Sequence, residues 1–357
     1  GASEKNISFV INKKNCNKAL NTLHETFFEE NIKELNLFIV GVGNVGGKLL
    51  EQISKQYKYL IDVLKLRIRV ISLSNSKKTY SNNDGVDLKN WRKLLKSGNK
   101  MNLNLLYNNI KKLNLRNSIF VDNTASEKIS DEYEKYLETN IGVITCNKIA
   151  CADRYNKYLN LKNLSRKYGS PFLFETNVGA GLPVIDTLNN LVDSGDRILK
   201  IQAVLSGSLN FIFNNFKKPD TFHEIVLKAK EEGYTEPDPK IDLSGVDVAR
   251  KILILARESG MKLELDQIKN KSFLPEESIN SKDEKSFIES LVKHKSIFNL
   301  LLENANKNNS RLKYVAELEN GKASVGLKEV EKGHDFYNLK GSDNIVLFYT
   351  NRYFEQP

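Results

Sequence analysis

The stretch Leu37-Phe-Ile-Val-Gly-Val-Gly-Asn-Val-Gly46 decides the fold that this sequence predicts. Four apolar residues lead into three glycines at G-x-G-x-x-G spacing, and residues 47–53 follow with helical periodicity. Strand, glycine turn and helix in this order are typical of a dinucleotide-binding unit. In such a unit Gly41 makes the tight turn, Gly43 lets the backbone approach a pyrophosphate, and Gly46 allows close helix packing.

We therefore predict that this turn binds a dinucleotide, whose phosphates face the unpaired N–H groups at the helix start. The residues assigned to this contact are Gly41, Val42, Gly43, Asn44, Val45 and Gly46. The second strand, residues 66–73, ends in Ser-Asn-Ser-Lys-Lys, without the acidic residue that selects NAD. Asn75 and Lys77 are assigned to the cofactor. Lys77 or Lys78 is expected to pair with a 2′-phosphate, which favours NADP over NAD, and two solvated loop lysines are the alternative.

Apolar strands and helical stretches alternate after residue 37 and predict an α/β protein with a Rossmann-type, doubly wound parallel sheet. After about Gly179 the pattern changes and predicts a second, α+β domain. We expect the domains to span residues 1–35, 36–178 and 179–357. The first segment, with a strand over Asn6–Ile11 and a helix over Asn17–Glu30, is too short for a core of its own. We expect it to be the end of an upstream module.

The composition of the 357 residues limits the partners. Basic residues number 54 and acidic residues 44, but the two signs are interspersed, so we expect attraction for anionic small molecules and no nucleic acid partner. No apolar run reaches the ~18 residues of a membrane span, and no secretory signal pattern is present, so we expect a cytoplasmic protein without a membrane partner. Three cysteines without CxxC spacing predict neither a disulfide framework nor a zinc site.

The densest polar cluster reads GYTEPDPKIDLSGVDVARK and ends at Lys251. Its two prolines predict an extended stretch over residues 236–240, and Asp242 or Ser244 is expected to cap the helix that follows. On that helix Asp247 and Lys251 are four residues apart and share a face. Spacing alone leaves two interpretations: a surface ion pair worth ~0.3–0.5 kcal/mol, or a pair that transfers a proton.

This cluster closely resembles the signature of the homoserine dehydrogenase family. Three further blocks are similar to that family in order and spacing: TCNK at Thr145–Lys148, ETNVGAGLP at Glu175–Pro183 and SGSLNFI at Ser206–Ile212. The resemblance extends from about Leu37 to the C-terminus. Residues 1–35 resemble the end of the regulatory ACT region that precedes this domain in the bifunctional aspartate kinase–homoserine dehydrogenases.

The resemblance implies an NAD(P)-dependent oxidoreductase that interconverts L-homoserine and L-aspartate 4-semialdehyde in threonine and methionine biosynthesis. The α+β domain would then serve catalysis and dimerisation, in a homo-oligomer (dimer or larger) fused to aspartate kinase in the full-length protein. Lys251 would move the proton, Lys148 would lie near the reacting centre and the cofactor, and Asp247 would orient Lys251. Oxidising an alcohol by hydride loss requires a base for the hydroxyl proton, and a lysine amine can act as one.

The resemblance also implies the contacts around the reacting groups. Substrate binding is assigned to Glu236, Asp242, Gly207 and Ser208, and the loop near the nicotinamide to Thr124 and Ala125. A monovalent cation such as sodium, held mainly by backbone carbonyls, would involve Glu175, Val178, Ala180 and Leu182.

Two residues depart from the family pattern: Ile241 stands where many relatives have Asp, and Cys146 where many have Pro. The sequence also ends before a glycine-rich, cofactor-contacting loop and a helix that relatives carry, so we expect a piece shortened at its C-terminus. Two other functions remain open. One is a semialdehyde dehydrogenase with Cys146 as the nucleophile. The other is an NADP-binding, catalytically inactive interaction fragment of the fusion protein.

Overall fold

The computed structural model describes residues 2–3, 6–16, 19–20, 22–23, 27 and 32–355. The chain folds into two compact units: residues 1–149 with 159–174, and residues 150–158 with 175–357. The two boundaries that the sequence predicts between the three domains stay a prediction. Within the described ranges, no helix combines the length and the apolar character that crossing a membrane requires.

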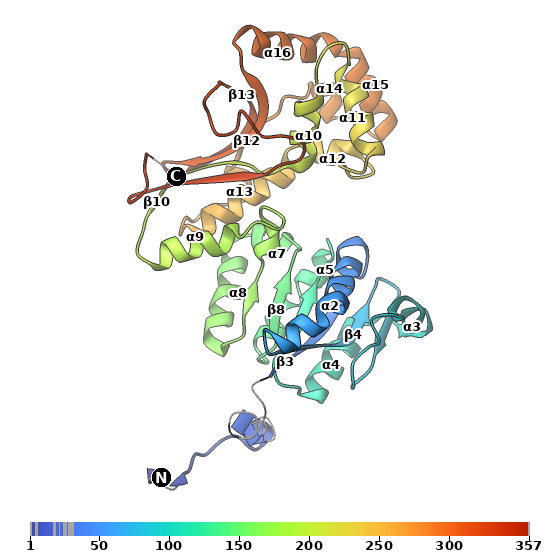
Figure 1. Ribbon diagram of the computed structural model, residues 1–357, viewed down its shortest axis with the longest axis vertical. Helices are drawn as coiled ribbons and strands as arrows, with labels where there is room; N and C mark the ends of the chain where they lie inside the picture. Colours follow the sequence, from blue (N-terminus) through green and yellow to red (C-terminus); the bar gives the residue numbers. More distant parts are fainter. Residues whose placement is uncertain are drawn as a thin grey trace. The chain divides into compact units, whose positions relative to one another are not determined.

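The first unit contains a seven-stranded sheet with the order β6-β5-β4-β3-β7-β8-β9 (Figure 1). The parallel strands are β3 (Lys33–Val40), β4 (Leu66–Ser74), β7 (Ser118–Asp122), β8 (Gly142–Thr145) and β9 (Phe172–Leu173). At one edge the antiparallel strands are β5 (Lys78–Ser81) and β6 (Asn99–Lys100). The predicted doubly wound parallel sheet is confirmed, and the antiparallel edge is an addition that the sequence pattern did not predict. Because β4 and β7 flank β3 on opposite sides, the topological switch point lies at the carboxyl ends of β3 and β7.

Helices cover this sheet and bury its apolar strands. They are α2 (Asn44–Asp62), α3 (Trp91–Ser97), α4 (Leu103–Leu113), α5 (Glu127–Ser130), α6 (Tyr133–Leu137) and the part of α8 (Tyr155–Tyr168) from residue 159 onward. The short helix α7 (Ile149–Ala152) has only Ile149 in this unit. Leu37 and Ile39 of β3 pack in one core cluster with Leu50 and Ile53 of α2. The apolar run before the glycine turn and the apolar positions after it therefore meet in one core, which fixes the turn between them.

The second unit contains a five-stranded sheet with the order β11-β13-β12-β10-β14. Its strands are β10 (Ile198–Val204), β11 (Lys269–Lys271), β12 (Arg311–Glu319), β13 (Lys322–Val330) and β14 (Ile345–Thr350), antiparallel except for the parallel pair β11 and β13. Its helices are α9 (Val184–Asp193), α10 (Gly207–Asn215), α11 (Phe222–Glu231), α12 (Pro239–Leu243), α13 (Val246–Glu258), α14 (Glu276–Ile279), α15 (Glu284–Lys293) and α16 (Lys295–Lys307). Helices α11, α14, α15 and α16 gather on one side of the sheet (Figure 1).

The N-terminal segment differs in part from the expectation. Strands β1 (Ala2–Ser3) and β2 (Asn6–Ile7) pair antiparallel over two residues each, so the strand expected over Asn6–Ile11 is shorter. Phe9 and Val10 lie beyond this pairing and are exposed. Their apolar side chains are not buried there, so they do not lengthen the strand. The helix expected over Asn17–Glu30 lies largely outside the described residues.

Candidate active site

The glycine turn after β3 has the geometry that a pyrophosphate needs. Gly41 has a φ of +89°, which L side chains rarely adopt. A Cβ on Gly46 would fall 1.9 Å from the Gly41 carbonyl oxygen, whereas a Cβ on Gly43 would meet no atom within 4 Å. The turn is therefore closed between Gly41 and Gly46, and Gly43 faces open space where a phosphate can approach the backbone.

The start of α2 is open to an anion. Asn44 and Val45 lie exposed in its first turn, which contains no acidic residue. In the described part of the chain no side chain caps this helix. Its first N–H groups and the positive end of its dipole are therefore available to a phosphate, and these residues fit a dinucleotide.

The loops after β7 and β8 are joined by Asp122, which is fully buried at the end of β7. Its Oδ1 accepts a hydrogen bond from Thr124 N (2.7 Å), and its Oδ2 accepts from Tyr133 Oη (2.6 Å) and Asn147 Nδ2 (3.1 Å). A Cβ on Gly41 would lie 2.8 Å from Thr124 Cγ2. The structure thus brings Thr124 against the glycine turn. Asp122 was not among the predicted site residues, although a carboxylate at the carboxyl end of a parallel strand could have been noticed.

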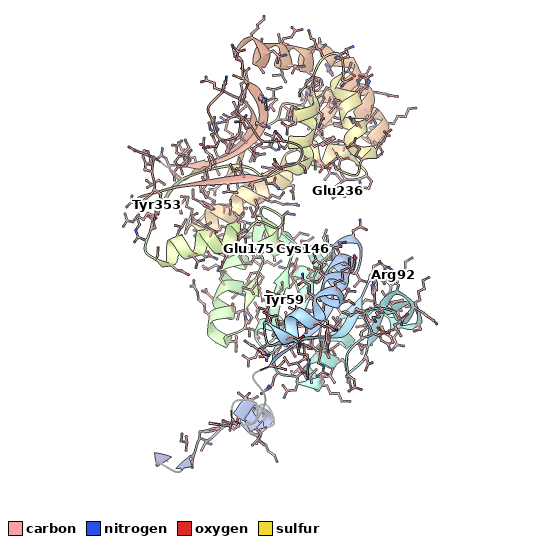
Figure 2. The ribbon with its side chains drawn as sticks, in the orientation of Figure 1. Tyr59, Arg92, Cys146, Glu175, Glu236 and Tyr353 are labelled. Atoms are coloured by element: carbon pink, nitrogen blue, oxygen red, sulfur yellow. The ribbon has the colours of Figure 1, made fainter. Side chains whose placement is uncertain are left out.

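Cys146 and Lys148 follow β8 on either side of Asn147, and Cys146 is marked in Figure 2. Lys148 is partly buried, and Ala125 in the neighbouring loop is exposed. Burial, and then the charge of Asp122, raise the pKa of the Cys146 thiol, while the Lys148 ammonium opposes this rise. A thiol whose pKa is raised forms little thiolate, so the geometry argues against Cys146 as a nucleophile.

The two lysines after β4 have different environments. Asn75 Oδ1 accepts hydrogen bonds from the backbone N–H groups of Lys77 and Lys78, each at 2.8 Å, and so fixes the turn. Lys78 belongs to β5 rather than to a loop, and its Nζ donates to Gly98 O at 2.8 Å. Lys77 is exposed on the turn. Of the two, Lys77 is the one whose ammonium is better placed to meet a 2′-phosphate.

In the second unit, Asp242 connects two of the residues assigned to the substrate. Its Oδ1 accepts from Ser208 Oγ and its Oδ2 from Glu236 N, both at 2.8 Å. Burial raises the pKa of Asp242, and the nearby Asp247 charge adds to the rise, while the two hydrogen bonds oppose it. Glu236 is exposed in the turn ahead of α12 (Figure 2), so its carboxylate is accessible to a ligand.

The expected extended stretch over residues 236–240 is wrong from Pro239 onward, because α12 begins there. Proline is tolerated at the first helical position, where its missing N–H would have no partner. The side chain of Asp238 caps α12 by accepting from Lys240 N at 3.0 Å. Asp242 therefore lies inside α12, and the prediction that it caps the next helix is wrong.

Helix α13 begins at Val246, after Gly245 with a φ of +74°. Ser244, the other expected cap, contributes only a long contact in which its Oγ accepts from Val246 N at 3.3 Å. A Cβ on Gly245 would fall 1.9 Å from Tyr314 Oη, so only glycine fits where the chain enters this helix.

Lys251 on α13 has two partners. Its Nζ lies 2.8 Å from Asp247 Oδ2, in the i,i+4 pair that the spacing predicted, and it donates to Leu205 O at 2.7 Å. The Lys251 side chain is 15% exposed and that of Asp247 44%. Leu205 immediately precedes Ser206, which caps α10 by accepting from Leu209 N at 3.1 Å.

The start of α10 therefore brings the assigned residues of the second unit together. Gly207 and Ser208 form its first turn, Lys251 reaches the carbonyl just before it, and Asp242 accepts from Ser208. A basic side chain, two carboxylates and a hydroxyl converge there. This arrangement can hold an ammonium group and move a proton.

Of the residues assigned to a cation, Glu175 begins η2 (Glu175–Asn177), and the other three lie in the loop between η2 and α9. Glu175 uses both carboxylate oxygens on this helix, accepting from Ile185 N and Asp186 N at 2.8 Å each. Ala180 has a φ of +53° and Val178 is fully buried. Glu175 O accepts a hydrogen bond from Val178 N, and Leu182 O accepts one from Val184 N. Each carbonyl oxygen keeps a second lone pair, which can still bind a cation.

A Rossmann sheet with an open glycine turn defines a dinucleotide-binding fold, and the second unit places a lysine beside carboxylates. Two family models match the chain: "Homoserine dehydrogenase, NAD binding domain" over residues 41–175 and "Homoserine dehydrogenase" over residues 183–356. The homoserine dehydrogenase of Schizosaccharomyces pombe is 37% identical over 334 residues, which cover 90% of this chain and 89% of that protein. The chain belongs to the homoserine dehydrogenase family.

Longer relatives carry a second activity in their names. The bifunctional aspartokinase/homoserine dehydrogenase 1, chloroplastic, of Arabidopsis thaliana is 39% identical over 361 residues, covering 100% of this chain. The chain spans 40% of the length of that relative. Among solved structures, a protein of unknown function from Candida auris is 32% identical with a TM-score of 0.78, and the similarity covers 90% of this chain and 91% of that one.

A hyperthermophilic archaeal homoserine dehydrogenase in complex with NADPH has a TM-score of 0.67 at 23% identity, over 89% of each chain. At this identity the likeness concerns the fold alone.

Proposed function

We propose that this protein interconverts L-homoserine and L-aspartate 4-semialdehyde, with Lys251 as the residue that moves the proton. One observation supports this most directly. The Lys251 ammonium is paired with Asp247 and bound to the carbonyl that precedes α10, next to the Ser208–Asp242–Glu236 chain of hydrogen bonds. An alcohol that is also an amino acid needs a proton carrier and an anionic partner for its α-ammonium, and this cluster supplies both.

Each side chain has a task in this proposal. Glu236, exposed ahead of α12, binds the substrate α-ammonium, and Asp242 holds the Glu236 backbone and Ser208 in place. The Lys251 amine accepts the hydroxyl proton during oxidation, and its ammonium returns a proton to the developing alkoxide during reduction. Asp247 orients Lys251. Lys148 is assigned to the reacting centre by the family resemblance.

The cofactor we propose is NADP, whose nicotinamide ring accepts or returns the hydride when it is bound. The residues that would hold it are the glycine turn, the first turn of α2, and the loops at Thr124 and Ala125. The absence of an acidic residue after β4 and the exposed ammonium of Lys77 support NADP over NAD.

Further parts of the proposal rest on the family. We propose a cytoplasmic homo-oligomer of two or more chains, in which this domain is fused to aspartate kinase. We also propose a monovalent cation bound at Glu175, Val178, Ala180 and Leu182. Several relatives carry the kinase in the same chain, and some of them are chloroplastic.

The test is reduction of NADP by the full-length protein with L-homoserine at alkaline pH, followed by the reverse reaction with L-aspartate 4-semialdehyde. Homoserine-dependent reduction that saturates, and that D-homoserine does not support, is the expected result. A third arm supplies the semialdehyde with NADP and phosphate: reduction of NADP there alone, with transfer of the acyl group to phosphate, would instead indicate thioester chemistry at Cys146. Binding of NADP without turnover in either direction would indicate the inactive interaction fragment.

A further inference from the structure

Lys313 is a buried cation that the proposed reaction does not use. It lies on β12 with 0% of its surface exposed, and burial lowers its pKa to about 8, with a smaller effect from Arg311 that the Asp343 charge opposes. Its Nζ donates to Asn210 Oδ1 (2.9 Å), Asn214 Oδ1 (2.6 Å) and Leu339 O (3.0 Å). All three hydrogens of the ammonium therefore have an acceptor.

Each asparagine forms a bridge through its amide. Asn210 Nδ2 donates to Asp343 O at 2.9 Å, and Asn214 Nδ2 donates to Gly341 O at 3.0 Å. Because an ammonium only donates, the amide oxygens must face Lys313 and the amide nitrogens must face the carbonyls of residues 339–343. Lys313 thus determines how α10 is joined to the loop that leads into β14.

Stability alone does not explain a lysine at this position. Burying an ammonium costs more than burying an apolar side chain of similar volume, unless a carboxylate compensates. Among the residues that the structure describes, no carboxylate oxygen lies within the 4.0 Å of an ion pair with Lys313 Nζ. A methionine could fill the same space at a lower desolvation cost, so the specific hydrogen bonds are what the lysine adds.

These hydrogen bonds fix α10 along its length, at Asn210 in its first half and at Asn214 near its end. The loop packs directly on its first residue, since a Cβ on Gly207 would lie 3.3 Å from Ser342. The same turn contains Ser208, which donates to Asp242, and follows Leu205, whose carbonyl accepts from Lys251. A shift of α10 would therefore move the partners of both the carboxylate and the proton carrier.

We propose that Lys313 is a positioning residue for the substrate site, which holds the start of α10 against residues 339–343 and so sets the geometry of Ser208, Asp242 and Lys251. The proposal rests on the proposed function, because it concerns the same substrate residues. Its effect is confined to the second unit, so cofactor binding at the glycine turn is independent of it.

The experiment compares three variants of the full-length protein. Lys313→Met removes the three donors but keeps the bulk, and Asn214→Ala removes one acceptor while the ammonium stays. Lys328→Met is the matched control, because Lys328 lies on the neighbouring strand β13 and its ion pair is with Glu317 of the same sheet. Steady-state kinetics, NADP titration and hydrogen exchange of the amides at residues 209–212, the first that are hydrogen-bonded in α10, are measured for each.

Lys313→Met should raise the homoserine KM about tenfold or more, the size that losing a hydrogen bond to a charged group produces. Asn214→Ala should change the KM in the same direction by less. Amide exchange at residues 209–212 should become about tenfold faster in Lys313→Met, because the local opening loses the same bond. NADP affinity should stay at the parental value in both, and Lys328→Met should match the parent throughout.

A folded Lys313→Met protein with parental KM and parental exchange at residues 209–212 would overturn the proposal, even if its melting temperature fell. If Lys313→Met does not fold, Asn214→Ala decides the question by the same criteria. A parent that does not turn over homoserine would refute the proposed function, and the exchange measurement would still decide whether Lys313 fixes α10.

Discussion

Replacing Lys251 by methionine distinguishes the two interpretations of its spacing with Asp247: a surface ion pair, or a pair that transfers a proton. Methionine keeps the apolar stem and the helix preference of lysine but removes the atom that carries the proton. The Nζ that is lost has two partners, Asp247 Oδ2 at 2.8 Å and Leu205 O at 2.7 Å.

The cost in stability follows from the exposure of those partners. Asp247 is 44% exposed, so water replaces the ammonium and the lost ion pair is worth up to about 1 kcal/mol. The carbonyl of the fully buried Leu205 loses a charged donor, which adds about 1–3 kcal/mol. The free energy of unfolding should therefore fall by up to about 4 kcal/mol. A missing proton carrier costs about 10²- to 10⁴-fold in kcat, equal to about 3–5 kcal/mol of activation free energy.

The assay measures kcat for homoserine and thermal unfolding in the full-length protein. Lys251→Arg keeps the charge but cannot release its proton near neutral pH, so it should lose nearly as much turnover as the methionine variant. The matched control is Lys157→Met, because Lys157 and Asp153 form an i,i+4 pair at the same 2.8 Å distance. This control should retain parental kcat. Turnover of Lys251→Met within about threefold of the parent would remove Lys251 from the mechanism, since general acid–base catalysis contributes far more.

Three further predictions concern the other assigned groups. Glu236→Gln should raise the homoserine KM strongly and leave NADP affinity unchanged, because its carboxylate is proposed to bind the substrate ammonium; loss of both affinities together would mean that Glu236 maintains the fold. Lys77→Gln should narrow the preference for NADP over NAD more than Lys78→Gln, since Lys78 Nζ already donates to Gly98 O; equal ratios of the two cofactor dissociation constants before and after both changes would refute the phosphate pairing. Because burial raises the pKa of Cys146 and shields its thiol, iodoacetamide at about pH 8 should alkylate it more slowly than the exposed Cys16. Peptide mapping that finds Cys146 modified first at that pH would revive the thioester mechanism.

The parts of the fold that were predictable depend on local chemistry. The glycine spacing after an apolar strand indicates both the positive φ of Gly41 and the close approach at Gly46, because each follows from the absence of a Cβ. The pairing of Asp247 with Lys251 follows from the helical period. These features require no knowledge of residues distant in the sequence.

The parts that the sequence does not predict depend on residues far apart in the sequence, or on a proline that fits both an extended segment and the start of a helix. Pro239 was interpreted as a sign of extended backbone, but at the first position of α12 it favours the helix. Lys313 and its acceptor Leu339 are separated by 26 residues, and periodicity does not indicate that a lysine on a strand is buried. The hydrogen bonds of Asp122 also join elements whose contact is visible only after folding.

In the proposed reaction a hydride moves directly between the hydroxyl carbon of homoserine and the nicotinamide ring. L-homoserine that carries two deuterium atoms at C4 reports this transfer, with mass spectrometry of the reduced cofactor and of the trapped aldehyde. We predict one deuterium in each NADPH formed, one deuterium left on the aldehyde, and loss of both products in Lys251→Met. NADPH without deuterium, or deuterated NADPH formed equally fast by Lys251→Met, would contradict the proposed mechanism.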